Sequence, residues 1–589
     1  MKPFVCTGFW CLPGQNELVA GSLHVSRSGE LRLSLIGSLR GEKGGAPGTA
    51  PSTILGSVDE SPCGNSVTLY GCVLSGSSVG SYRGAREEYR ASRGFFGSHL
   101  ATDEEFRFRS VLVKLEGLSE WAHSLSGLRG GHNPFPTSRN ADEIVPVLSY
   151  HVPTPLDGRL SRATVKLSFG VSAKSDGQSF RFREQPNLLV DFDSALPEGE
   201  INSRYLYPLQ NLMTFVADRP EKVESVSVWR GENRNDWENN PEIRVIGPRV
   251  QPDDEKRKAV HSQEMLFTLA DVEFTTFLEK WLRLAERYVE AFNIYFGIQY
   301  GPPSYLDMTY ALVAQSISLY YMKTSEGINQ LTEDERQLKS IIPALNKRDV
   351  EWLIDHLGAR PHPAFRNVLR RLVDRHGAVL DPILANRRDA FVNQAAATLH
   401  YIRHRESIER GAASHGAELY WLMQKLRFLI KACILSELGF STEQIAGFFN
   451  RNAYFQHISG LEKGRVQNEA HGKTVDLSLQ FVVPTDAVLQ AARKMAASTS
   501  LDEQQVGNAL LELTDVTNKT KDAVGDVDNK KQYDLAPYFD FKFGDALEAA
   551  RRLKLSQVEN VRHVAETLLS QSEAIAASKE SFLKATTQH

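Results

Sequence analysis

The chain has few cysteines, and they lie far apart. Its 589 residues include five, Cys6, Cys11, Cys63, Cys72 and Cys433. Such scattered thiols make neither a disulfide framework nor the paired short spacing of a zinc site. The chain also lacks a run of about eighteen apolar residues and a secretory leader. These absences exclude a disulfide-stapled secreted domain, and we expect a cytoplasmic protein with reduced thiols and no membrane contact.

A large excess of either charge is missing as well. The formal net charge is -4 at pH 7, which excludes a protein that coats nucleic acid through an overall positive charge. Basic residues do crowd locally, however, around a group of histidines: Arg366, Arg370, Arg371, Arg375, Arg387, Arg388, Arg403 and Arg405. Such a run is either a solvated helix face or a phosphate-binding surface, and the sequence leaves both open.

The first part of the chain has the pattern of an antiparallel β domain. Up to about residue 250, apolar and polar residues alternate in many short runs separated by Gly, Pro, Asn and Asp, as in Leu31-Arg-Leu-Ser-Leu35. This period of two predicts a β-rich, sandwich-like domain over residues 1–264. Two segments rich in Gly and Ser, at 37–65 and 75–93, are predicted to be long loops.

From Met265 the spacing of apolar residues becomes helical. We expect a connecting helical segment at 265–304, a helical bundle at 305–460 and a polar, mainly helical extension at 461–589. The predicted helices are 305–323, 333–345, 348–357, 365–375, 389–404 and 418–438, with 485–495 and 501–513 in the extension and a linker at 517–531. The fold class is therefore α+β, a β-rich domain followed by an all-α bundle and a helical extension.

The helix predicted at 389–404 carries the most informative residues. Asp389 can cap it, and one apolar stripe, which includes Val392, Ala395 and Leu399, is expected to face a core. His400 and His404 lie one turn apart on a neighbouring face.

The helices at 389–404 and 418–438 resemble the C-terminal half of a HEPN domain of the ApeA type, in which the first helix usually contains Thr-Arg-Asn-Tyr-x-x-His. The same register here is Thr398-Leu399-His400-Tyr401-Ile402-Arg403-His404. Stretches at 67–70, 106–121, 206–212 and 265–297 resemble the N-terminal domain that precedes HEPN in ApeA proteins. The resemblance ends at about residue 461.

This resemblance implies an antiphage, abortive-infection protein whose β-rich domain senses a phage-derived trigger and whose bundle cuts RNA, with tRNA as one candidate. It implies His404 as the catalytic histidine, with His400 assisting and Arg403 and Arg405 contacting phosphate. Histidine suits proton transfer near neutral pH, and arginine suits phosphate. No metal or other cofactor is expected, and a homodimer through the bundle is expected because two such helices commonly meet in the family.

Leu399 stands where the family has its arginine, and it has neither a charge nor a hydrogen-bond donor. The sequence therefore leaves two hypotheses open: a modified ribonuclease, or a catalytically impaired HEPN protein that binds RNA or protein and regulates a partner. A weaker third is a carbohydrate- or phage-protein-binding sheet domain on a dimerising bundle. A zinc ion at His400 and His404 lacks an evident third ligand.

Two other stretches imitate the motif. Arg371 to His376 has the Arg-x4-His spacing, and Arg451 to His457 begins with Arg-Asn and ends on histidine. Such spacings arise by chance in an arginine-rich chain, and we predict a structural role for the second stretch in particular.

Overall fold

The computed structural model describes residues 2–39, 51–80, 84–130, 148–175, 180–248 without 235, 237 and 238, 260–329 without 303 and 326, 364–404, 413–470, 486–525 and 544–569. The chain divides into two compact units. The first contains Met1–Val368 and Ile430–Gln456, and the second contains Leu369–Leu429 and His457–His589. All described strands belong to the first unit, and the described part of the second is helical, which confirms the predicted α+β class.

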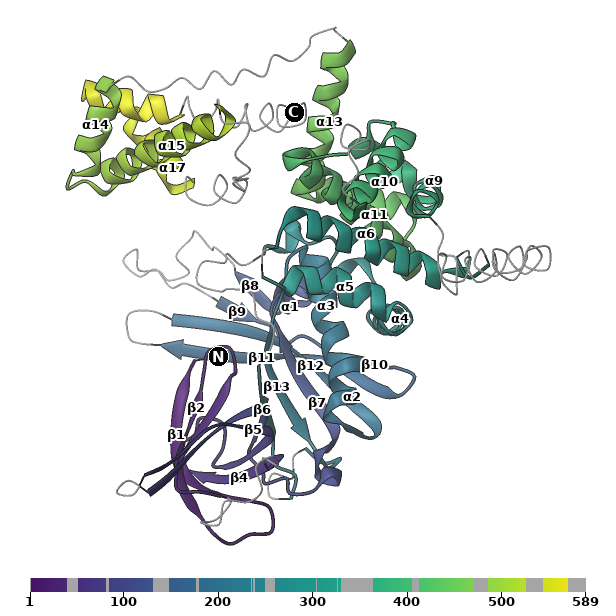
Figure 1. Ribbon diagram of the computed structural model, residues 1–589, viewed down its shortest axis with the longest axis vertical. Helices are drawn as coiled ribbons and strands as arrows, with labels where there is room; N and C mark the ends of the chain where they lie inside the picture. Colours follow the sequence, from purple (N-terminus) through teal and green to yellow (C-terminus); the bar gives the residue numbers. More distant parts are fainter. Residues whose placement is uncertain are drawn as a thin grey trace, which may run out of the picture. The chain divides into compact units, whose positions relative to one another are not determined.

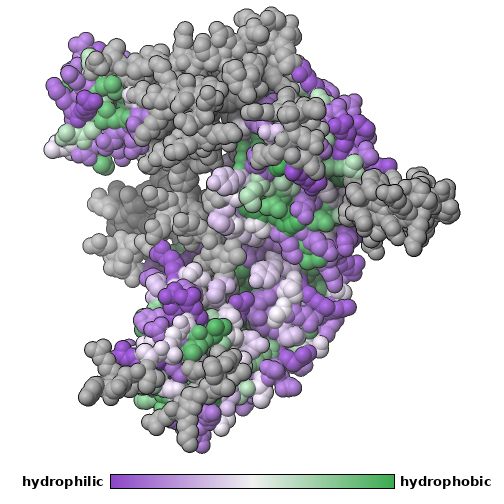
Figure 2. All heavy atoms as spheres, viewed as in Figure 1, coloured by the Kyte–Doolittle hydropathy of each residue, from purple (hydrophilic) through white to green (hydrophobic). Residues whose placement is uncertain are grey.

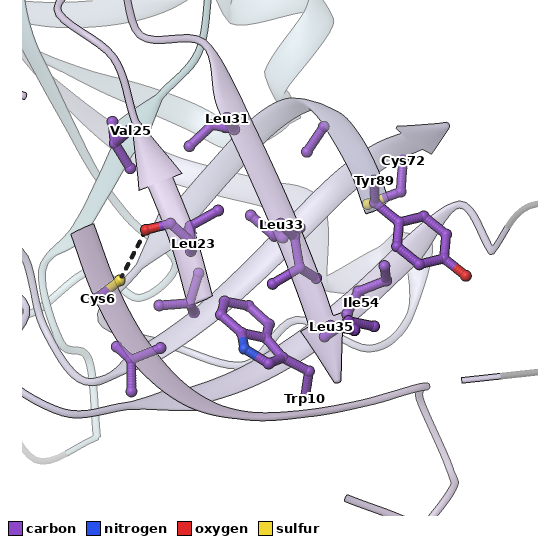
Figure 3. Close-up of a cluster of buried hydrophobic side chains, with 14 of the residues drawn as sticks. Cys6, Trp10, Leu23, Val25, Leu31, Leu33, Leu35, Ile54, Cys72 and Tyr89 are labelled. Atoms are coloured by element: carbon purple, nitrogen blue, oxygen red, sulfur yellow. Dashed lines mark hydrogen bonds between the residues drawn. The ribbon is translucent and has the colours of Figure 1, made fainter. Parts of the chain in front are cut away.

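Six strands close into an antiparallel barrel (Figure 1). Around the ring they are β6 (Gly84–Phe96), β3 (Leu31–Ile36), β2 (Val19–Val25), β1 (Phe4–Cys11), β4 (Thr53–Val58) and β5 (Ser66–Gly80), and β5 pairs with β6 again. Alternate residues fill the interior, among them Trp10, Leu33 and Ile54 (Figure 3). Closure leaves these strands without a free edge, so this region is a barrel and not the predicted sandwich.

The loop predicted at 75–93 was wrong, because these residues form most of the β5–β6 hairpin, in which Cys72 lies opposite Ala91. One inward-facing residue of β6 is a buried carboxylate, Glu87. It accepts hydrogen bonds from the hydroxyls of Tyr89 and Ser38, at 2.8 and 2.7 Å. A charged residue at an interior position breaks the apolar alternation and concealed the strand. The loop predicted at 37–65 contains β4, and its residues 40–50 lie outside the described ranges.

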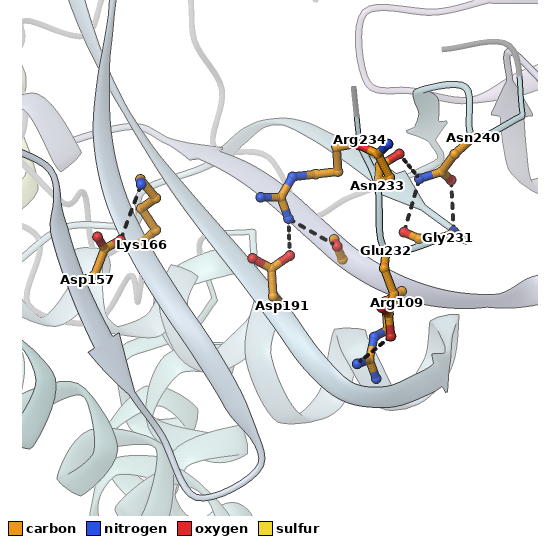
Figure 4. Close-up of polar contacts among 10 residues, drawn as sticks. Arg109, Asp157, Lys166, Asp191, Gly231, Glu232, Asn233, Arg234 and Asn240 are labelled. Carbon is orange, nitrogen blue, oxygen red and sulfur yellow. Dashed lines mark hydrogen bonds and ion pairs between the residues drawn. The ribbon is translucent and has the colours of Figure 1, made fainter. Parts of the chain in front are cut away.

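The barrel continues into an open antiparallel sheet through β6. This sheet runs through β14 (Ile243–Ile246), β13 (Val223–Trp229), β7 (Arg107–Leu115), β12 (Phe180–Pro197), β11 (Ala163–Ser175) and β10 (Leu156–Arg159), and β8 (Leu128–Gly130) pairs separately with β9 (Leu148–Tyr150). Asn240 organises the β13–β14 turn by bonding to Gly231 and Asn233, and Arg234 of this turn pairs with Asp191 on β12 (Figure 4).

The exterior of the barrel carries scattered apolar side chains. Val5, Phe9 and Ile36 are more than half exposed, at 54%, 53% and 69%. Figure 2 shows that the visible face of the strand-rich part is otherwise hydrophilic or mixed, with a small apolar patch. Single exposed apolar residues are ordinary in soluble proteins and indicate no particular partner.

Helices complete the first unit. They are α1 (Leu118–Trp121), α2 (Glu198–Ile201), α3 (Tyr207–Ala217), α4 (Phe274–Arg287), α5 (Val289–Tyr300), α6 (Leu306–Lys323), α12 (Thr442–Arg451) and the second half of α11 (Gly416–Leu438). The buried indole of Trp281 on α4 donates a hydrogen bond to the carbonyl oxygen of Pro208 on α3, at 2.7 Å. The ring of Phe267 lies 5.2 Å from that of Phe440 and 5.7 Å from that of Phe448, so the segment around α12 packs on residues that follow the sheet.

The second unit contains most of α9 (Phe365–Leu384), α10 (Arg388–His404), the first half of α11 and most of α13 (Ala453–Ala470). Its C-terminal part comprises α14 (Asp486–Ala496), α15 (Leu501–Gly525), α17 (Gly544–Leu553) and helical residues 559–569. Buried residues such as Ala492, Leu510 and Val564 give these helices a core of their own.

Most predicted helices agree with the structure, with shifts at their ends. The helix predicted at 365–375 extends to Leu384, and α15 reaches Gly525, which shortens the predicted linker. The helices predicted at 333–345 and 348–357 lie outside the described residues. The four-part division at 264, 304 and 460 stays a prediction.

Candidate functional site

Position 399, where the family has its arginine, lies on the buried face of α10. Val392, Ala395 and Leu399 are 2%, 0% and 3% exposed, as their spacing predicts. A residue at position 399 therefore faces the core of the second unit, and an arginine side chain there would bring a charge into apolar surroundings. The departure from the family pattern thus coincides with a packing position.

The start of α10 differs slightly from the prediction. The helix begins at Arg388, and the carbonyl of Arg387 accepts the first helical hydrogen bond, from the amide of Phe391 at 3.1 Å. Asp389 consequently lies in the first turn and is not the cap. A carboxylate in this turn still interacts favourably with the positive end of the helix dipole.

A second row of side chains on α10 forms hydrogen bonds with residues at the start of α11. Gln394 donates a hydrogen bond to the carboxylate of Glu418 at 3.1 Å. One turn later, the hydroxyl of Thr398 donates to the Gln394 carbonyl and accepts from the backbone amide of Ser414, at 2.7 and 3.0 Å. Thr398 is fully buried, so these bonds are shielded from water and fix the two helices to each other.

The same row continues to an aromatic contact. The ring of Tyr401 lies 5.2 Å from the ring of His415, edge to face at 89°. His415 directly precedes α11 and is partly buried. No periodicity in the sequence marks this histidine, because it lies in the polar stretch between the two helices. Its position immediately before a helix start was the only local signal.

The predicted site residues lie at the C-terminal end of α10. His400 and Arg403 are exposed, and His404 is the last residue of the helix. Arg405 lies outside the described residues. The negative end of the helix dipole falls at this point and favours cationic side chains. The structure therefore brings His400, Arg403 and the backbone of His404 together within the last turn and a half.

The arginines that crowd around the histidines include both paired and exposed side chains. Arg388 is structural, because its guanidinium pairs with both carboxylate oxygens of Asp381, at 2.8 and 2.6 Å. Gly377 makes room for it, since a Cβ there would lie 2.4 Å from the central guanidinium carbon. Four arginines on α9 are instead exposed: Arg366, Arg370, Arg371 and Arg375. A solvated helix face and a phosphate-binding surface both require such exposure.

Both stretches that imitate the motif make contacts within the fold. His376 is 6% exposed, and burial with the nearby Arg375 charge lowers its pKa to about 4, so the ring is neutral and inaccessible. Arg451 ends α12 and lies over the ring of Phe448 at 5.3 Å. The side chain of Asn452 accepts a hydrogen bond from the Phe455 amide at 3.1 Å, which caps the start of α13. A structural role for the second stretch stays a prediction, and these contacts are the kind that such a role requires.

Among the described helices, none combines the length and the apolar character that crossing a bilayer requires.

An antiparallel β domain followed by helices, with a Tyr-x-x-His pattern closing α10, defines an α+β protein with a HEPN-type bundle. The model of the ApeA N-terminal domain 1 family matches residues 5–281, and the model of the Apea-like HEPN family matches residues 312–444. The chain belongs to the ApeA-like family, which places it among antiphage defence proteins of the HEPN type. No curated protein and no solved structure matches the chain.

Proposed function

We propose that this protein defends a cell against phage by cutting RNA at the C-terminal end of α10. His404 is the central histidine of the proposed site, His400 assists it, and Arg403 and Arg405 contact phosphate. The observation that supports this most is the exposure of His400 and Arg403 beside His404, at a helix end that favours cationic groups. No metal is required for this chemistry.

The proposed reaction is attack of a ribose 2′-hydroxyl on the adjacent phosphate. The bond from 2′-oxygen to phosphorus forms while the bond from phosphorus to the 5′-oxygen breaks, giving a 2′,3′-cyclic phosphate and a 5′-hydroxyl. One imidazole takes the proton of the 2′-hydroxyl, and another group gives a proton to the leaving oxygen. Leu399 cannot bind the phosphate, so the guanidinium must come from Arg403, Arg405 or the exposed arginines of α9.

The proposed RNA substrate, trigger and association of two copies are those that membership of the family implies. The RNA is tRNA or another cellular RNA, and cutting it halts growth of the infected cell. The β-rich domain receives the phage-derived trigger, and two copies of the chain associate through the helical bundle in the cytoplasm. Exposed residues at the end of α10 are compatible with a site that takes groups from both copies.

One observation favours a second function. Leu399 is 3% exposed and belongs to the packed stripe of α10, so this helix is built for packing at the position where the family has its phosphate-binding group. A protein with this helix can bind RNA or a partner protein without cutting RNA. In that case the protein regulates a partner and is not itself the nuclease.

An in-vitro cleavage assay separates the two functions. Purified full-length protein is incubated with labelled tRNA and mRNA, with and without extract from phage-infected cells. His404→Ala and His400→Ala are tested beside His563→Ala, a control that removes an exposed histidine from the C-terminal helices. Loss of cleavage with His404→Ala but not His563→Ala supports the ribonuclease. RNA binding without cleavage by the parent protein supports the regulator.

A further inference from the structure

The outer edge of β11 is only partly covered by its neighbour. The strand β10 pairs with Thr164–Leu167 of β11, whereas β12 pairs along its whole length, from Ala163 to Ser175. Among the described residues, no strand pairs with the outer edge of β11 beyond Leu167 (Figure 1). This end of the large sheet therefore presents a free strand edge.

The sequence before β10 explains why the cover stops there. Pro153 and Pro155 precede Leu156, the first residue of β10, and proline has no backbone N–H to donate to a ladder. The amide of His151 instead donates to the carbonyl oxygen of Gly127, at 2.9 Å, so this segment is held beside the start of β8. The residues that could have continued β10 along β11 are thereby directed away from it.

Two hydrogen bonds show which backbone groups of β11 face the free edge. The carbonyl of Ala163 accepts from the amide of Leu160 on the β10 side, at 2.8 Å. The carbonyl of Arg162 accepts from the amide of Asp193 on the β12 side, at 3.2 Å. Alternate residues direct their N–H and C=O groups to opposite neighbours, and β11 pairs with β12 without a register shift. The residues whose backbone groups face outward on the uncovered part are Phe169, Val171 and Ala173.

The two faces of this free edge differ in chemistry. Val171 is 46% exposed and Ala173 is exposed as well, so one face offers apolar contacts. The other face has small residues such as Ser172, followed by the exposed Lys174, and Arg183 on β12 lies opposite Ser172 and is also exposed. Among the described residues, neither Lys174 nor Arg183 pairs with a carboxylate. The second face is therefore open and basic.

We propose that the free edge of β11 binds an extended segment of a partner protein, which adds to the sheet as a further strand. An unpaired edge is a template for such addition, in which backbone hydrogen bonds supply affinity and alternate side chains supply specificity. The bound strand has apolar residues on the face of Val171 and acidic residues on the face of Lys174. This inference deepens the proposed reception of a phage-derived trigger, and it rests on that proposal for the source of the strand.

The charge of the edge favours a partner protein over a second copy of this chain. A lysine on an edge strand disfavours the pairing of like edges, and Lys174 occupies such a position. An acidic strand is attracted by the same charge, and the small side chains at Gly170 and Ser172 leave room for its longer carboxylates.

The test measures binding of a labelled synthetic peptide of alternating valine and glutamate to the full-length protein by fluorescence polarisation. Val171→Pro removes one outward N–H that the ladder with β12 does not use, and proline is tolerated on edge strands. We expect this variant to bind at least about tenfold more weakly than the parent. Val171→Thr keeps the N–H and is the matched control, with binding within about threefold of the parent. Circular dichroism checks that both variants fold.

The charge of the second face is tested with a peptide of alternating valine and lysine, which should bind the parent more weakly than the glutamate peptide. No binding of the glutamate peptide by the parent, or equal binding by the parent and Val171→Pro, overturns the proposed edge site. A parent dimer that Val171→Pro dissociates in sedimentation equilibrium gives the edge to a second copy and also overturns it. A parent protein that binds the peptide but never cuts RNA overturns the proposed ribonuclease, while the edge site stands.

Discussion

Lys431 on α11 and Asp218 at the end of α3 form a buried ion pair, with Nζ and Oδ1 2.5 Å apart. Their side chains are only 3% and 15% exposed. The amide of Asn452 donates to the other carboxylate oxygen at 3.4 Å. Asp218 belongs to the ApeA N-terminal domain and Lys431 to the HEPN domain, so a charge pair inside the first unit joins the two family domains.

Removing one partner of this pair should be costly. Lys431→Met leaves the Asp218 carboxylate buried without its cation, and we expect the free energy of unfolding to fall by about 3–5 kcal/mol. Urea denaturation followed by circular dichroism measures the loss. The double variant with Asp218→Asn should lose less than the sum of the single variants, because it leaves no uncompensated charge.

An exposed ion pair is the matched control. Arg283 and Glu279 on α4 lie 2.6 Å apart, but the arginine side chain is 71% exposed. Arg283→Met should cost no more than about 1 kcal/mol. If Lys431→Met is as mild as Arg283→Met, the Lys431–Asp218 pair does not hold the two domains together.

Glu221 should make the first unit less stable as the pH rises. Burial raises its pKa from the ordinary value of 4.5 to about 7, and the nearby Glu116 carboxylate acts in the same direction, while the Arg219 guanidinium opposes it. The folded state thus holds a proton that the unfolded chain has lost. Its stabilising contribution is complete below about pH 4.5 and disappears as the pH rises through about 7. Glu221→Gln should flatten this decline in unfolding midpoints measured from pH 4.5 to 8, and an unchanged slope would refute the assignment.

His376 should have the opposite pH dependence. Burial, helped by the Arg375 charge, lowers its pKa from 6.5 to about 4, so the folded state keeps the ring neutral where the unfolded chain is protonated. Its contribution is complete above about pH 6.5 and disappears as the pH falls through about 4, by about 3 kcal/mol at most. Replacing the ring by an aliphatic side chain, His376→Leu, should make urea midpoints of the second unit less sensitive between pH 4 and 6.5. Equal sensitivity in parent and variant would contradict the prediction.

The sequence could predict what depends on local periodicity. Leu31, Leu33 and Leu35 do point into one core, and the apolar stripe of α10 is buried as its spacing indicates. Closure of the barrel could not be predicted, because it depends on the pairing of β5 with β6, which local alternation does not specify. The buried carboxylate of Glu87 also interrupts the apolar alternation of β6, so the sequence of this strand was interpreted as a loop.

The candidate site was predicted only along one helix, for the same reason. His400, Arg403 and His404 follow from the register of α10, since a helix fixes the relative positions of residues three and four apart. The contact between Tyr401 and His415 depends on how α10 packs against the start of α11. No spacing within a single helix contains that information.

Restoring the family's arginine should not restore its chemistry. Leu399→Arg places a guanidinium at a position that is 3% exposed and belongs to the packed stripe with Ala395. We expect the free energy of unfolding to fall by several kcal/mol, on the order of the cost of an unpaired buried charge. We expect no gain in RNA cleavage. Asn393→Arg makes a similar change on the exposed face of α10 and should alter stability by less than about 0.5 kcal/mol. Thermal unfolding and the cleavage assay, run on both variants, test this directly. A Leu399→Arg protein that is stable and cuts RNA faster than the parent would show that position 399 reaches the substrate, and that the packing of α10 adapts to admit the arginine.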